Sequence, residues 1–105
     1  MEVSLTKRDI TEVKSFGKPP QDVKDVLLAT CILLGHPKDT DWKMIQRIMG
    51  DPIFINSINN FEADECTPEA MEEARKILAE KDLDKVKSVN MAAFELMKWC
   101  QYILE

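Results

Sequence analysis

The sequence predicts an all-α fold, and three observations support that prediction. Apolar residues recur at steps of three and four along most of the chain, and no long stretch alternates apolar and polar residues as a strand would. Proline, glycine and capping residues divide the chain into segments of helical length. A chain of 105 residues with 45% hydrophobic content can bury one core, so we expect a single domain.

The stretch 18–37, KPPQDVKDVLLATCILLGHP, carries start and stop signals for one helix. Pro19 and Pro20 favour a first helical turn, and Gly35 is a typical left-handed residue after a last turn. One face is apolar throughout and consists of Val23, Val26, Leu27, Thr30, Cys31 and Leu34. The first half keeps a polar face, whereas the second half is apolar nearly all round. The helix should therefore begin at the surface and end in the core, which makes its N-terminal end a candidate for partner contact.

Residues 1–16 form the first predicted helix. Val3, Ile10 and Val13 lie close to a seven-residue repeat and make a narrow apolar seam, suited to pairing with one other helix. The start of this helix has no convincing cap. Gly17 and the prolines that follow it interrupt the helix before the next one begins.

The middle of the chain contains two shorter predicted helices. Asp39 or Thr40 can cap a helix over 42–49, which Gly50 ends. An Asp-Pro pair then opens a short helix over 52–59.

Three further helices complete the prediction. Thr67 starts one that runs to about residue 80, and Asp82 can cap a short one over 83–89, which carries Leu83, Val86 and Val89. The last helix begins at about Asn90 and reaches Glu105 without a glycine, a proline or a cap. We therefore expect both chain ends to be helices cut mid-length, and the chain to be a piece of something larger.

One core is predicted from the apolar faces of these helices. Its expected members are Val26, Leu27, Cys31, Leu34, Trp42, Ile45, Phe54, Ile58, Phe61, Leu96 and Trp99. The three cysteines, Cys31, Cys66 and Cys100, are odd in number and far apart, which argues against a secreted disulfide framework and for a reducing compartment. We interpret Cys31 and Cys100 as small core residues rather than reactive thiols, because both lie on apolar helical faces.

The charge of the chain is unevenly spread. The net charge of −5 gives no general case for nucleic-acid binding, and no apolar run approaches the roughly 18 residues that a membrane span needs. Residues 62–84 contain nine acids and three bases, a net charge of −6, so the rest of the chain sums to +1. An acidic side and a neutral to basic side therefore coexist, and the overall charge is a poor guide to the partner.

The sequence contains no recognisable catalytic, cofactor or metal site. His36, the one histidine, lies in a turn between a glycine and a proline, and we interpret it as a solvated turn residue. The cysteines lack the spacing of zinc sites, and the three glycines are too dispersed for a phosphate-binding loop. We therefore expect no cofactor, and a binding or mechanical role is favoured over an enzyme.

Several segments in order resemble the microtubule-binding domain at the stalk tip of dynein heavy chains. They are ITEVKSFGKPPQDVKDVLLATCILLG (10–35), DWKMIQRIM (41–49) and the Lys-Trp pair at 98–99. The resemblance implies a compact bundle of about six helices at the tip of an antiparallel coiled coil. Residues 1–17 would then be the end of the first stalk helix. Residues 18–105 would be the bundle, with the last helix running on into the second stalk strand.

The resemblance also implies a partner and its contact residues. The family binds tubulin through the start of the first bundle helix, the short third helix and the final helix region. Carried over to this chain, the candidate microtubule-binding residues are Lys18, Lys24, Asn56, Asn59, Lys85 and Lys87. The last two lie beside Ser88, where family members can carry an arginine, so the basic footprint here departs from that pattern.

The resemblance further implies that the register of the stalk coiled coil sets the affinity for the microtubule. Gly17, Pro19 and Pro20 would be the hinge. The remaining partner would be the rest of the heavy chain, whose ATPase sites lie elsewhere; no nucleic acid or membrane is expected. The amino-acid sequence of residues 10–35 is more similar to ciliary than to cytoplasmic members of the dynein family, so we expect a cytoskeletal, axonemal protein.

The alternative is a small helical adaptor that binds a protein through an apolar groove. An adaptor should end in capped helices and bind with little dependence on salt. A stalk-tip domain should have its two termini side by side.

Overall fold

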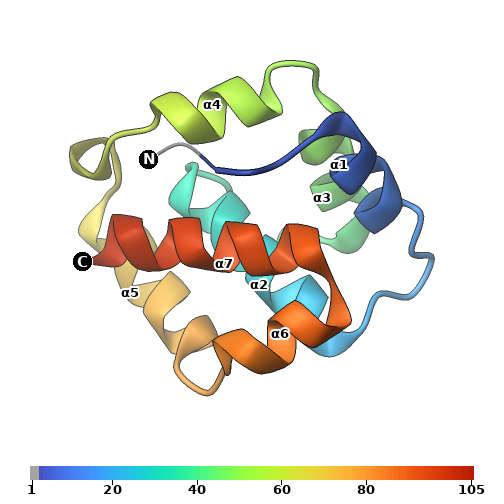
Figure 1. The fold of residues 1–105 in the computed structure, drawn as a ribbon. Coiled ribbons are helices and arrows are strands. Elements are labelled where there is room, and N and C mark those ends of the chain that lie inside the picture. The colour runs from blue at the N-terminus through green and yellow to red at the C-terminus, as the bar shows by residue number, and fades with distance from the viewer. Residues whose placement is uncertain (1–2) are drawn as a thin grey trace.

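Seven α-helices and one 3₁₀ helix account for the secondary structure of residues 3–105, the part of the chain that the computed structural model describes (Figure 1). They are α1 (Lys7–Lys14), α2 (Gln21–Leu33), α3 (Trp42–Gly50), α4 (Phe54–Asn60), η1 (Ala63–Glu65), α5 (Pro68–Leu78), α6 (Leu83–Val89) and α7 (Met91–Leu104). These residues include no strand, which confirms the all-α prediction. None of these helices is long and apolar enough to cross a bilayer.

Helix α2 is the centre of the bundle and packs against α3, α5, α6 and α7. Figure 1 shows α7 crossing in front of α2, with α4 along one side of the bundle and α6 along the opposite side. The predicted core is confirmed as one cluster. Eight of the predicted members are buried, whereas Leu34, Trp42 and Phe61 are half-buried against the cluster.

The ends of α2 follow the local signals. Pro20 occupies the capping position with an extended backbone, and the helix begins at the next residue. Gly35 has a φ of 106°, as predicted for a left-handed residue after the last turn. The N–H of Gly35 donates to the carbonyl oxygen of Ile32, and that of His36 donates to Cys31, both at 3.0 Å. This paired arrangement satisfies two of the last carbonyls and ends the helix.

The prediction of one helix over residues 1–16 is wrong for its first part. Positions 1 and 2 lie outside the described residues, and residues 3–6 are not helical. The side chain of Thr6 accepts the N–H of Asp9, and the carboxylate of Asp9 accepts the N–H of Thr6. This capping box starts α1 at Lys7, so a cap is present where none was expected. Val3 is therefore not on a helical seam; it is buried ahead of the helix.

Two boundaries in the middle of the chain also differ from the prediction. Asp41, rather than Asp39 or Thr40, caps α3 by accepting the N–H of Met44 at 2.9 Å. The short helix starts at Phe54 rather than at residue 52, because the Asp51 carboxylate accepts the N–H of Ile53 and holds a turn there. The three later helices begin where predicted, and their caps are Thr67, Asp82 and Asn90.

The cysteines of the core are as predicted. Cys31 and Cys100 are buried, and burial raises the pKa of each thiol to about 12. The hydroxyl of Thr30 and the sulfur of Cys100 are 3.3 Å apart, a weak hydrogen bond within the core. Both thiols are therefore protonated packing groups at neutral pH.

Candidate functional site

The N-terminal half of α2 lies beside the turn that joins α5 to α6. Lys81, in that turn, places its ammonium nitrogen 2.9 Å from a carboxylate oxygen of Asp22 and 2.7 Å from one of Asp25. The hydrogen bond from Lys81 lowers the pKa of Asp22 below its ordinary value against partial desolvation, and the charges of Lys81 and Lys85 lower it further. Helix α6 itself also packs against α2.

Two predicted contact residues are brought together by this packing. Lys24 is exposed on α2, and Lys85 is exposed on α6, which packs against α2. Lys18 is also exposed, in the linker just before α2. The structure thus gathers predicted lysines from segments about 60 residues apart on a chain that is acidic overall.

A second lysine group lies where α6 meets α7. The ammonium of Lys87 sits over the ring of Phe94, 5.2 Å from its centroid, and that of Lys98 lies 4.7 Å from the same centroid. Lys98 also forms an ion pair with Glu95 at 3.3 Å. Sequence reasoning noted Lys98 only as part of a motif; its four-residue spacing from Phe94 was the signal that it shares a face with that ring.

The corner between α6 and α7 also exposes apolar side chains. Val89 is 40% exposed and Met91 is 48% exposed. Val89 therefore does not join the core; Val86 is the fully buried residue of this helix. Seven residues make fewer than two helical turns, so only one of its apolar positions points fully into the core. The corner combines exposed apolar side chains with lysines, a composition that suits a partner contact.

The asparagines of α4 do not join the lysines. Asn56 is exposed, but Asn59 is half-buried and its side-chain oxygen accepts the N–H of Val3 at 2.9 Å. Figure 1 shows α4 and α6 on opposite sides of the bundle, with α7 between them. Asn59 thus has a structural partner within the fold, and the predicted set divides into a lysine group and a separate α4 group.

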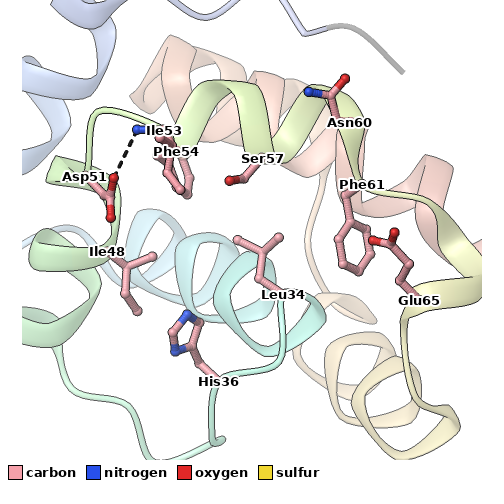
Figure 2. Close-up of a pocket in the computed structure, with 10 residues that line it drawn as sticks. All are labelled: Leu34, His36, Ile48, Asp51, Ile53, Phe54, Ser57, Asn60, Phe61 and Glu65. Carbon is pink, nitrogen blue, oxygen red and sulfur yellow. Dashed lines mark hydrogen bonds between the residues drawn. The ribbon is translucent and has the colours of Figure 1, made fainter.

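An open groove of about 540 Å³ lies between α4 and the ends of α2 and α3 (Figure 2). Leu34, Phe54 and Phe61 give it an apolar floor. Asp51, Glu65 and the half-buried His36 also line it, so His36 is less solvated than the sequence indicated. Two carboxylates make this groove unfavourable for an acidic partner, which instead matches the lysines of α2 and α6.

The linker between α1 and α2 is held by side chains of α3. The indole N–H of Trp42 donates to the carbonyl oxygen of Phe16, and the amide of Gln46 donates to that of Lys14 at 2.7 Å. Gly17 is exposed, and a Cβ added there would meet no atom within 4 Å. Residues 15–20 therefore interrupt the helical path between α1 and α2, but their start is anchored to α3.

A family described as the microtubule-binding stalk of the dynein motor matches residues 2–105. This chain belongs to that family. The capping box of α1 is a feature that we expected of a small adaptor, but the match over nearly the whole chain decides for the dynein stalk family.

Curated relatives agree with this assignment. The chain is 36% identical over 99 residues to a cytoplasmic dynein heavy chain of Caenorhabditis elegans, covering 92% of this chain. It is 35% identical over 98 residues to dynein axonemal heavy chain 2 of Homo sapiens, covering 91% of this chain. Dynein axonemal heavy chain 17 of Homo sapiens is 36% identical over 105 residues. The chain spans about 2% of the length of these relatives.

Proposed function

We propose that this dynein stalk domain binds the microtubule through a lysine surface made by the start of α2 and the corner between α6 and α7. We define the lysine surface as Lys18, Lys24, Lys85 and Lys87. The observation that carries the proposal is that α6 packs against α2, which places Lys24 and Lys85, 61 positions apart in the chain, on neighbouring helices. Tubulin is acidic, and the chain as a whole has a net charge of −5. The lysine surface is therefore the region of the chain whose charge complements that of tubulin.

The acidic residues support the same orientation. Glu69, Glu72 and Glu73 belong to α5, which packs on α2 but is a different helix from those that carry the lysines. The acidic segment 62–84 extends into the start of α6. There Asp82 caps the helix, and its carboxylate accepts the N–H groups of Asp84 and Lys85. We propose that α5 faces away from the microtubule, because its carboxylates would be repelled by the track.

We further propose that stalk register sets the affinity of this surface. Residues 1–17 would carry the first stalk strand and the end of α7 would lead into the second. Gly17, Pro19 and Pro20 lie in the non-helical linker that ends at α2, so a shift of the incoming strand would be transmitted to the segment from Lys18 to Lys24. Such coupling requires that the domain has two conformational states that bind tubulin with different affinities.

The parent would be a dynein heavy chain in the cytoskeleton, with its ATPase outside this segment. The similarity of residues 10–35 to ciliary dyneins predicts an axonemal parent. The relatives do not favour that class, since cytoplasmic and axonemal heavy chains match at 36% and 35% identity.

Co-sedimentation with microtubules tests the proposal. The bound fraction should fall steadily as salt rises, because charges at a wet interface are screened over about 8 Å at physiological ionic strength. A folded protein that stays in the supernatant at low salt would overturn the proposal. Binding that is insensitive to salt would show that the lysine surface does not carry the interaction.

A further inference from the structure

We propose that Lys81 masks two carboxylates that would otherwise oppose microtubule binding, and so acts on the lysine surface without contacting tubulin. The inference rests on the proposed function of that surface. Lys81 was assigned no role by the sequence, where it is one of three bases in the acidic run 62–84.

The position of Lys81 fits masking rather than direct contact. Its side chain is only 14% exposed, and its ammonium lies between Asp22 and Asp25, whose side chains are 27% and 23% exposed. Desolvation acts to lower the pKa of Lys81, but hydrogen bonds and charge from Asp25 and Asp22 raise it overall. The ammonium therefore stays charged and is directed at the two carboxylates rather than at the solvent.

The masked carboxylates lie within the proposed contact segment. Asp22 and Asp25 flank Lys24 on α2, so residues 22–25 alone carry a net charge of −1. Around the helix, Asp25 lies about 100° from Lys24, and Asp22 lies farther round, towards the α5–α6 turn. A track that spans Lys24 on α2 and Lys85 on the neighbouring helix α6 would therefore pass close to these carboxylates. Lys81 brings one positive charge from the α5–α6 turn and makes this local group neutral, which leaves the other lysines to set the sign of the surface.

A matched pair of variants tests the role of Lys81. Lys81→Met removes the charge and keeps an unbranched side chain, and it should weaken microtubule binding several-fold at low salt. Lys76→Met is the control. Lys76 belongs to the same acidic run and lies near two acids, Glu72 at 3.7 Å and Glu73 at 3.8 Å, but it is on α5 and 64% exposed. It should change binding little, and equal weakening by both variants would overturn the inference.

Neutralising the two aspartates distinguishes masking from direct contact. The double change Asp22→Asn with Asp25→Asn should strengthen binding little in the wild-type background, where Lys24 and Lys81 together balance the two negative charges. In the Lys81→Met background the same double change should increase microtubule affinity several-fold. A direct contact of Lys81 with tubulin predicts equal effects in both backgrounds, so additive effects would overturn masking.

The readouts separate failure of this inference from failure of the proposed function. A wild-type protein that does not bind microtubules overturns the proposed function itself. Wild-type binding with a folded Lys81→Met variant of equal affinity overturns only the masking role. Circular dichroism checks folding, and Lys81→Gln, whose amide can still donate to one carboxylate, replaces Lys81→Met if that variant loses its helical spectrum.

Discussion

The indole nitrogen of Trp42 lies 2.8 Å from the carbonyl oxygen of Phe16 and donates a hydrogen bond to it. Gln46, one turn further along α3, donates to the carbonyl oxygen of Lys14. These two side chains fix the exit of α1 against α3, just before the linker that leads to α2. Any movement of α1 relative to the bundle must therefore either break these two hydrogen bonds or move α3 together with α1.

Trp42→Phe should lower the free energy of unfolding by about 0.5–1.5 kcal/mol, the usual net contribution of one hydrogen bond. The ring keeps most of the packing, whereas the Phe16 carbonyl loses its closer donor and retains only Gln46 at 3.3 Å. Urea unfolding followed by circular dichroism measures the change. Stability equal to wild type would show that water replaces the indole N–H at no cost.

Leu27→Ala should cost about 2–5 kcal/mol of unfolding free energy, because Leu27 is 1% exposed at the centre of α2. Ile53→Ala is the matched control, since Ile53 is 61% exposed and should lose little. Denaturant titrations of both variants give the comparison. Similar losses at the two positions would contradict the burial seen here.

Lys24→Glu should weaken microtubule binding and leave the helical spectrum unchanged, because Lys24 is exposed and the new charge would face an acidic track. Lys38→Glu makes the same charge change beyond the other end of α2, whose last residue, Leu33, is about 14 Å from Lys24 along the helix axis. Sedimentation at low salt measures both affinities. If the control variant loses as much affinity as Lys24→Glu, overall charge rather than this segment controls binding.

The pair of Asp22 and Lys81 should make stability depend on pH at both extremes. The folded pKa of Asp22 is lowered, so its contribution is present above the ordinary carboxyl pKa of about 4 and is lost as pH falls through the folded value. The folded pKa of Lys81 is raised, so its contribution is present below about pH 10 and is lost as pH rises through the folded value.

The difference in unfolding free energy between wild type and Lys81→Met should therefore be level at intermediate pH and shrink at both extremes. Thermal or urea unfolding across the pH range measures it. A difference that does not change with pH would mean that the variant acts through packing alone.

Stalk register should change the affinity of the bundle. Rigid antiparallel coiled coils, fused in two registers to the start of α1 and to Glu105, should give different microtubule affinities; a tenfold change needs only about 1.4 kcal/mol. Replacing Gly17, Pro19 and Pro20 with a flexible linker, with Lys18 kept, should reduce the difference. Equal affinities in two folded fusion proteins would refute the register proposal.

Local signals in the sequence were sufficient for most helices. Prolines, glycines and capping residues act on the residues next to them, so the ends of α2 and the starts of α5, α6 and α7 could be predicted from neighbours alone. The periodicity of apolar residues likewise predicted one core, because burial follows the helical repeat. The start of α1 is also encoded locally, in the capping box of Thr6 and Asp9, although the apolar spacing of Val3 and Ile10 predicts a longer helix.

The tertiary structure decided which polar residues meet. Asn59 bonds to Val3 across 56 positions, and Lys81 reaches Asp22 across 59, so neither pairing could be read from spacing along the chain. The sequence by itself determined an all-α chain with an acidic segment and scattered lysines. Only the packing against α2 determined that Lys81 of the α5–α6 turn pairs with two carboxylates and that Lys24 and Lys85 lie on neighbouring helices, because electrostatic interaction depends on distance in space and not on separation in sequence.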